Sequence, residues 1–367
     1  MKLVFYAVRR AVVAFFLLVA LTFVTYVIFW QIPSDPACYV LPCGPARNLP
    51  PPSEYKRVRH FMGTDKPIIV QYGYFLAHAV SGDLGTAWTG MYEDQSGKIY
   101  RGPSVGSTLG DALRVTGSVV LGGVVILLLV TIPVGLLAAS RPNSIFDRTV
   151  LAVSLVAIST HPIVVGTVLQ TFLGKDWQLV PSQGYCPLIG GQTPGGGFNF
   201  ATNQAAFSCG GPKDWATHLI LPWITFALFF VAIYLRMIRV TVMEALGSQY
   251  VRTARAKGAG EWRVLRVHAF RNALLPILTM VGMDIGVALG ISLYIEAVYG
   301  LPGLGHVALT ALNGTVGFDL PFIVGLVLVV GIVVIGLNLV IDIVYAVLDP
   351  RIGSSSRERR RAFGGLA

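Results

Sequence analysis

Charged side chains are scarce in this 367-residue sequence, where they make up 13% of the residues while hydrophobic side chains make up 54%. Soluble domains are about one quarter charged. This shortage excludes a water-soluble globule, because too little polar surface remains to cover one. The bilayer is therefore the expected solvent. Despite the net charge of +10, we do not expect nucleic-acid binding, because the basic residues follow the pattern of a membrane topology.

The sequence also lacks the motifs of a nucleotide-driven motor or an enzyme. A P-loop needs Gly-Lys followed by Ser or Thr, but the two Gly-Lys pairs, Gly97-Lys98 and Gly174-Lys175, are followed by Ile and Asp. Paired carboxylates, a Ser-His-Asp set and a His-Glu-x-x-His motif are missing too. No Cys-x-x-Cys or nearby pair of histidines offers a metal site. We expect no catalytic residue, metal or cofactor in this chain.

Long apolar segments are abundant. A membrane-spanning helix needs about 20 mostly apolar residues. Six segments meet this requirement: 10–31, 113–139, 149–173, 217–240, 274–297 and 321–347. The expected fold class is an all-α membrane protein with six transmembrane helices. The first segment starts like a signal peptide, but no Ala-x-Ala site follows its long apolar core, which favours a retained helix.

The basic residues define the orientation of these helices. With both termini in the cytoplasm, 18 of the 28 Lys and Arg residues fall in cytoplasmic segments. Three lie near the N-terminus, two at 140–148, eight from 236 to 271 and five in the tail 351–367. Cytoplasmic loops carry such an excess of positive charge. We divide the chain into 1–112 (first helix and a long extracytoplasmic segment), a five-helix core at 113–350 with a cytoplasmic segment at 241–273, and the tail.

All four cysteines lie outside the cytoplasm on this topology. Disulfides persist in oxidising compartments, so we predict two local pairs, Cys38–Cys43 and Cys186–Cys209; four free thiols are the alternative. Two long outside segments, 32–112 and 175–215, contain them. Within the first of these segments, the apolar run 67–85 is too short to span and is expected to form an interfacial helix or to lie against the bundle.

The cytoplasmic segment 241–273 is long and distinctive. Ser248 is placed to cap a short helix that runs to Lys257, and Gly258 and Gly260 break it before a second helix starts near Glu261. Small residues on the first helix allow close approach of another backbone, and basic side chains beside them offer charge-assisted contacts. This pattern favours insertion into a cleft of a partner protein; binding to anionic membrane lipids is the alternative.

Polar residues also occur inside the predicted spans, where charges are costly and usually mark function or a protein-facing position. Asp284, Asp342, Asn338 and His161 are the candidates for lining a passage. The alternative is a structural network, in which Asp342 pairs with Arg114 or Arg236 and His161 is a satisfied interior histidine.

At the cytoplasmic segment the sequence resembles the permease subunits of ABC importers. Gly258 occupies the glycine of their conserved loop, with Arg252-Thr253-Ala254 in place of Glu-Ala-Ala. Tyr250–Gly258 and His268–Pro276 match the dipeptide/oligopeptide branch almost completely. Further fragments of that branch are Gly82-Asp83-Leu84-Gly85, Ile295–Gly305, Asp319-Leu320-Pro321 and Leu348-Asp349-Pro350-Arg351. The sequence departs from the branch in the Pro-rich insert near 36–52, the loop 175–215 and Thr160-His161-Pro162.

The resemblance implies a type I ABC importer permease in a bacterial plasma membrane. A second homologous permease would complete the passage, one or two ABC ATPase subunits would bind ATP and magnesium, and an extracytoplasmic binding protein would deliver a di- or oligopeptide. Contact with the ATPases would fall on the matching loop residues: Tyr250, Arg252, Thr253, Ala254, Arg255, Ala256, Lys257, Gly258 and Glu261. Import of nickel or glycosides by the same architecture is one alternative; an ion-coupled secondary transporter is another.

Overall fold

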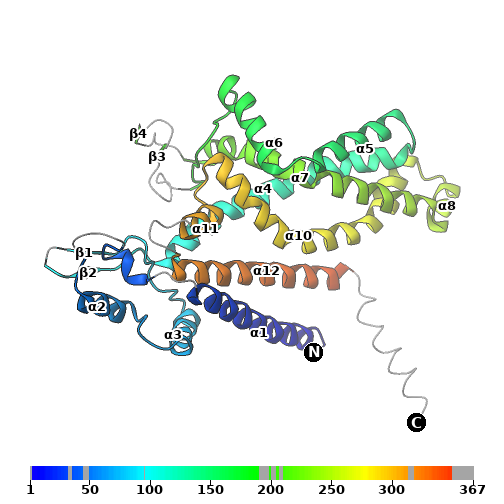
Figure 1. The fold of residues 1–367 in the computed structure, drawn as a ribbon. Coiled ribbons are helices and arrows are strands. Elements are labelled where there is room, and N and C mark those ends of the chain that lie inside the picture. Colours follow the sequence, from blue (N-terminus) through cyan, green and yellow to red (C-terminus); the bar gives the residue numbers. More distant parts are fainter. Residues whose placement is uncertain are drawn as a thin grey trace, which may run out of the picture. The chain divides into compact units, whose positions relative to one another are not determined.

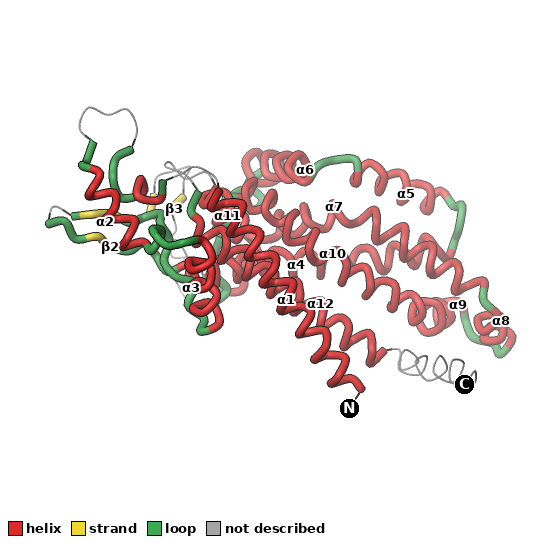
Figure 2. Tube along the Cα trace, turned by 60° about the horizontal axis from the view of Figure 1, so that its bottom comes forward, coloured by secondary structure: helices red, strands yellow, loops and turns green. Residues whose placement is uncertain are grey.

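Helices form most of the described part of the protein (Figure 2). The computed structural model describes residues 2–31, 35–43, 49–94, 96–189, 198–199, 204–205, 210–312 and 318–348. In chain order its elements are α1 (Lys2–Gln31), the 3-10 helix η1 (Pro36–Tyr39), α2 (Pro52–Met62), α3 (Ile68–Val80), β1 (Tyr92–Glu93), β2 (Ile99–Tyr100), α4 (Val105–Ser140), α5 (Ile145–Ile158), α6 (Pro162–Leu169), the π-helix η2 (Gln170–Asp176), β3 (Phe198–Asn199), β4 (Gln204–Ala205), α7 (Pro212–Gly247), α8 (Gln249–Ala256), α9 (Glu261–Arg263), the π-helix η3 (Val264–Ala269), α10 (Phe270–Tyr299), α11 (Leu304–Leu312) and α12 (Leu320–Leu348).

The predicted membrane spans are confirmed, with one modification. Helices α1, α4, α7, α10 and α12 are each long and apolar enough to cross a bilayer. The third predicted span is two helices, α5 and α6 with η2, bent by 101°. The break lies before Pro162, which is the first residue of α6, and His161 has the extended backbone that a following proline favours. Counted as one span, this pair is the sixth.

The chain divides into two compact units, and the division falls within α4, α7 and α12 and at the end of α10. The second unit holds residues 119–182, 217–298 and 334–367. There α4 and α7 approach closely, because Gly122 and Gly123 leave room for the rings of Trp223 and Phe226. At the cytoplasmic end of the same unit, a buried cluster joins α4, α7, η3 and α10; its members include Leu136, Ile238, Val242, Leu265, Ala269 and Ala273.

The first unit holds residues 1–118, 183–216 and 299–333. In it, α1 and the first half of α12 lie side by side (Figure 1), with Gly331 facing Leu18. Helix α3 confirms the short apolar helix predicted at 67–85 and packs against α1. The Tyr26 hydroxyl donates to Gln71 Oε1 (3.0 Å), and the Tyr72 hydroxyl donates to the carbonyl of Val19 (2.8 Å).

Asp319 connects the predicted outside segment 32–112 to the start of α12. It is fully buried and caps that helix, accepting the Phe322 N–H at 3.3 Å. Its second carboxylate oxygen accepts the N–H of Thr89 at 2.7 Å, although the two residues are 230 positions apart. The Asp-Leu-Pro fragment at 319–321 therefore has a structural role in holding the segment before α4 against the start of the last span.

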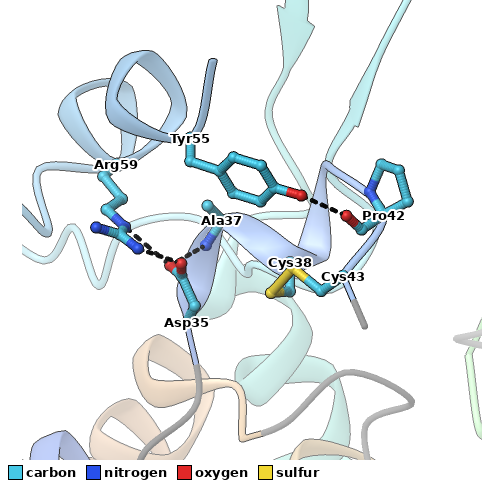
Figure 3. Close-up of a disulfide and its surroundings, with 7 residues drawn as sticks. All are labelled: Asp35, Ala37, Cys38, Pro42, Cys43, Tyr55 and Arg59. Carbon is cyan, nitrogen blue, oxygen red and sulfur yellow. Dashed lines mark hydrogen bonds and ion pairs between the residues drawn. A yellow bond between two sulfur atoms is a disulfide. The ribbon is translucent and has the colours of Figure 1, made fainter. Parts of the chain in front are cut away.

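One of the predicted disulfides is present. Cys38 and Cys43 are bonded, with their Cα atoms 5.5 Å apart, and the loop packs on α2 (Figure 3). The Tyr55 hydroxyl donates to the carbonyl of Pro42 (2.6 Å). Cys186 is buried, but Cys209 lies outside the described residues, and the second pair stays a prediction.

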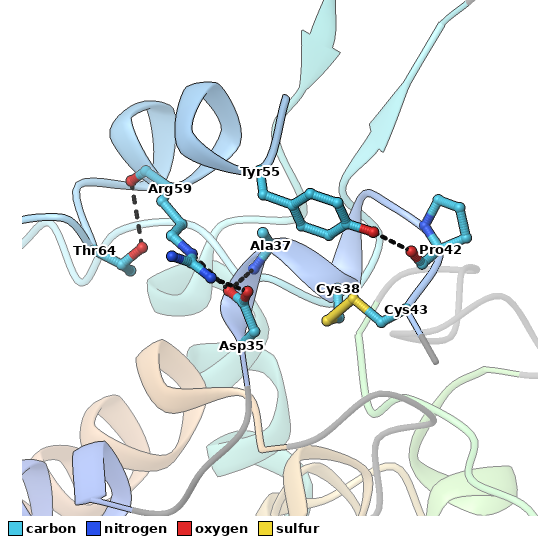
Figure 4. Close-up of polar contacts among 8 residues, drawn as sticks. All are labelled: Asp35, Ala37, Cys38, Pro42, Cys43, Tyr55, Arg59 and Thr64. Carbon is cyan, nitrogen blue, oxygen red and sulfur yellow. Dashed lines mark hydrogen bonds and ion pairs between the residues drawn. A yellow bond between two sulfur atoms is a disulfide. The ribbon is translucent and has the colours of Figure 1, made fainter. Parts of the chain in front are cut away.

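A polar contact ties the start of η1 to α2 (Figure 4). Arg59 binds both carboxylate oxygens of Asp35, with its Nε 3.0 Å from Oδ1. Asp35 also caps η1, accepting the N–H of Ala37 at 3.1 Å. The hydrogen bonds from Arg59 are the main cause that holds the pKa of Asp35 below its usual value.

Acid should therefore loosen α2. Because the folded pKa is lowered, the stabilisation is complete above the unfolded value near 4 and is lost as the pH falls through the folded pKa. We expect amide-exchange protection in α2 to fall as the pH drops from about 4 through the lowered pKa of Asp35, and Asp35→Asn to give the low-pH protection at every pH. The control is Asp111→Asn, which removes an exposed pair with Arg114. Equal pH dependence of α2 protection in wild type and Asp35→Asn would refute a stabilising role of the Asp35–Arg59 contact.

Candidate functional site

The predicted coupling segment folds as two short helices at a corner. Helix α7 ends at Gly247, α8 follows at Gln249–Ala256, and α9 starts at Glu261. Ser248 occupies the N-cap position, but the prediction that its side chain caps the helix is wrong. Its hydroxyl donates backwards to the carbonyl of Ala245, since the turn of α7 ends within its reach.

Gly258 closes the C-terminus of α8. Its φ of +84° is left-handed, a region that residues with a side chain rarely adopt. Its N–H donates to the carbonyl of Arg255 (2.9 Å), and the Ala259 N–H donates to the carbonyl of Ala254 (3.1 Å). These two bonds form a Schellman motif, which satisfies carbonyls at the helix end and turns the chain sharply. The predicted glycine corner thus has a defined geometry.

Most of α8 is open to its surroundings. Val251 is its fully buried residue, whereas Tyr250, Arg252 and Thr253 are exposed, as are the residues from Arg255 to Gly258. Ala254 is half-buried. The helix is therefore held to the second unit by one apolar anchor and presents small and basic side chains outward.

An ion pair braces the corner. Arg255 Nε and Nη2 lie 2.9 Å from the two carboxylate oxygens of Glu261. Arg255 was expected to offer its charge to a partner, but much of its hydrogen-bonding capacity is used within the chain. In the described part of the protein, Arg252 and Lys257 are in no ion pair, so they are the basic side chains of α8 best placed for a partner.

The π-helix η3 joins α9 to α10 directly behind this corner. π-helical turns are rare and are frequent at functional sites. Val264, Leu265 and Ala269 are buried, and the last two belong to the cluster that packs α4, α7 and α10 together. A displacement of α8 would therefore act on the packed ends of three long helices.

The passage candidates lie in separate surroundings. Asp284 on α10 is half-buried, and the Tyr234 hydroxyl on α7 donates to its Oδ2 at 3.0 Å. His161 is exposed and caps α6, accepting the N–H of Ile163, and its ring meets Tyr294 edge-on at 4.9 Å. Asn338 donates to the carbonyl of Val334 on its own helix. The side chain of Asp342 lies outside the described residues.

A buried ion pair was missed by the sequence reasoning. Asp147 is 1% exposed, and Arg239 on α7 donates to both its oxygens, with Nη2–Oδ2 at 2.8 Å. Asp147 Oδ2 also accepts the N–H of Asn143, which has a left-handed φ of 63°. The pair joins the connector 140–148 to the helix that leads into α8. An acid after Ser144 signals a helix start, but nothing in the sequence points to a partner 92 positions away.

Comparisons with known proteins place the chain in a family. Residues 131–354 match the family model of the binding-protein-dependent transport system inner membrane component, and residues 3–95 match the model of its N-terminal region. A putative peptide permease protein of Brucella suis biovar 1 is 31% identical over 348 residues, covering 95% of this chain and 98% of that protein. The dipeptide transport system permease protein DppB of Escherichia coli K12 is 31% identical over 337 residues, covering 91% and 94%. With these matches the resemblance seen in the sequence is confirmed: the chain belongs to the inner-membrane components of binding-protein-dependent transport systems, the multi-pass permease subunits of bacterial ABC importers.

Proposed function

We propose that this chain is the passage-forming subunit of an ATP-driven importer of di- and oligopeptides, coupled through α8 to separate ATPase subunits. The peptide substrate is supported by relatives that cover almost the whole chain and are named peptide permeases. A separate motor is supported by the sequence, in which neither Gly-Lys pair is followed by Ser or Thr. ATP and magnesium would then bind to the partner subunits.

The geometry of α8 carries the coupling proposal. Helix α8 is exposed, carries small residues and ends at a left-handed glycine. Arg252 and Lys257 make no ion pair with the residues that the structure describes, and this combination suits a groove on another protein. The ion pair between Arg255 and Glu261 keeps the corner rigid. A displacement of α8 would therefore be transmitted to η3 and α10, because the turn would not deform.

A second permease would complete the passage. Gly286 and Gly290 on α10 are exposed, and no atom of the described residues lies within 4 Å of a Cβ added at either position, whereas Gly282 packs on Ile341. The two open glycines allow a second helix to approach closely. The external binding protein would dock on the outside segments and deliver the peptide.

Asp284 is the residue we propose to face the passage, where a carboxylate would receive the positively charged amino group of a peptide. Asp284→Asn should reduce peptide uptake about tenfold or more, as expected for one charge-assisted hydrogen bond, while leaving complex assembly unchanged. Tyr234→Phe is the matched variant, because it removes the hydrogen bond to Asp284 but keeps the charge. Uptake that is unchanged in Asp284→Asn would remove this residue from the passage.

Isolation of the chain from its native membrane in mild detergent tests the whole proposal. A second permease of similar length and P-loop ATPases should accompany it, and the complex should hydrolyse ATP faster when the loaded binding protein is added. A chain that purifies alone and transports without ATP would overturn the proposal. Stimulation by nickel or a glycoside, and not by peptides, would keep the architecture and refute the substrate.

A further inference from the structure

A cavity of about 320 Å³ lies in the first unit, among α1, α3, the end of α2 and the start of α12. Aromatic rings form much of its wall, including those of Tyr26, Phe61, Tyr74 and Trp88. Two cationic side chains, Lys66 and Arg101, also line it, and no carboxylate is among the lining residues of the described chain. The cavity wall thus combines aromatic rings with polar groups and positive charge.

Both cations are held at the cavity by aromatic rings. Lys66 Nζ lies 4.3 Å from the centre of the Tyr74 ring, and the Arg101 guanidinium lies 5.7 Å from that of Phe61. These distances are within the range of cation–π attraction. Neither cation is in an ion pair within the described part of the protein. The acid beside Lys66 in sequence, Asp65, has its Oδ2 2.7 Å from His60 Nδ1. Both positive charges therefore remain available to an anion.

The cavity lies at the outer boundary of the membrane. The apolar span of α1 ends at Phe29, and that of α12 begins at Leu320. Tyr26 in the last turn of the first span and Leu320 and Val324 at the start of the other line the cavity. Tyrosine and tryptophan rings are enriched at this depth, where lipid headgroups meet the hydrocarbon.

Helix α3 extends this site into the outer leaflet. The Tyr72 hydroxyl bonds to Val19, which lies ten residues before Phe29, or about 15 Å along the helix axis at 1.5 Å per residue. The hydrocarbon core is about 30 Å thick, so α3 lies beside α1 within its outer half. The face of α3 turned away from α1 is apolar, with Ile69 72% and Val80 76% exposed. Tyr74 is on this exposed face and also lines the cavity.

We infer that this cavity binds an anionic phospholipid of the outer leaflet. The phosphate lies between Lys66 and Arg101, and the acyl chains follow the exposed apolar face of α3. A peptide fits less well, because its amino group would find no carboxylate among the lining residues described here. The site rests on the membrane location of the chain and not on the proposed substrate, so it survives if the importer carries something other than peptides.

Lipid binding by the full-length chain tests this inference. Native mass spectrometry of the chain in mild detergent should detect tighter binding of phosphatidylglycerol than of phosphatidylcholine. A basic residue near the membrane surface contributes about fivefold to such binding. Lys66→Gln and Arg101→Gln should each weaken phosphatidylglycerol binding about fivefold, and the double variant about 30-fold. Phosphatidylcholine binding should stay the same.

Lys98→Gln is the matched control. Lys98 also lies over an aromatic ring, 5.1 Å from the centre of Tyr100, but it is absent from the cavity wall. Its replacement should leave lipid binding unchanged. Equal losses in Lys66→Gln and Lys98→Gln would reveal a general effect of charge and overturn the site. Equal binding of the two lipids by the wild-type chain would also overturn it, even if the double variant fails to fold.

Competition distinguishes other sources of the anion. Millimolar inorganic phosphate and a dipeptide should each leave phosphatidylglycerol bound. Displacement by phosphate alone would assign the two cations to a free anion, and displacement by the dipeptide would assign the cavity to the substrate. Either result would contradict a lipid site.

Discussion

Gly258→Val should lower ATP-driven uptake at least about fivefold while the chain still reaches the membrane. A β-branched residue in the left-handed region costs about 1–3 kcal/mol, which would reduce the population of the native corner about 5- to 150-fold. Among the described residues, no atom lies within 4 Å of the added Cβ, so the loss would come from backbone strain and from the ATPase that receives α8. Uptake into proteoliposomes and co-purification of the ATPases measure the two effects.

Gly260→Val is the matched control for this change. Gly260 is two residues away, equally open, and has an ordinary extended backbone with φ −65° and ψ 151°. It should therefore tolerate valine with normal uptake. If Gly258→Val transports like the wild type, or if both variants fail equally, the corner does not act as the coupling element that we propose.

Loss of the Asp147 carboxylate should be the most destabilising single change outside the coupling corner. Removing one partner of a buried ion pair leaves the other charge uncompensated and costs about 3–5 kcal/mol. In Asp147→Ala, the Arg239 guanidinium and the N–H of Asn143 both lose their acceptor. We expect a clearly lower melting temperature of the purified chain in detergent.

Two further variants test whether the loss of stability in Asp147→Ala comes from the uncompensated buried charge of Arg239. Asp147→Leu with Arg239→Met should recover most of the stability, because apolar residues can replace a buried pair at little cost. Glu261→Gln removes the ion pair with Arg255, which is as well aligned as that of Asp147 and Arg239 but exposed. The Glu261 side chain is 73% accessible and the Arg255 side chain 40%. It should cost no more than about 1 kcal/mol. A mild effect of Asp147→Ala would show that water or another acceptor satisfies the N–H groups of Arg239.

Local signals predicted most of the fold. Length and hydropathy located the spans, and the basic residues gave their orientation. The glycine corner was predicted because a left-handed turn needs a glycine whatever surrounds it. The Cys38–Cys43 pair followed from short spacing on the oxidising side of the membrane.

Long-range contacts could not be predicted in this way. The partners of Asp147 and Asp284 are 92 and 50 residues away in the sequence. The spacing of residues in a single sequence does not indicate which helices are in contact. The size of the bend between α5 and α6 is likewise set by packing. Ser248 failed as a capping residue for a related reason, because the end of the preceding helix offered its hydroxyl a nearer acceptor.

Dependence of uptake on ATP is the most direct test of the central claim. The chain, reconstituted in proteoliposomes with its second permease and ATPases, should import a labelled dipeptide when ATP and the binding protein are present together. Removing ATP should stop uptake, and dissipating the proton gradient should leave it unchanged. Uptake that continues without ATP and follows an imposed ion gradient would contradict the account and make the chain a secondary transporter.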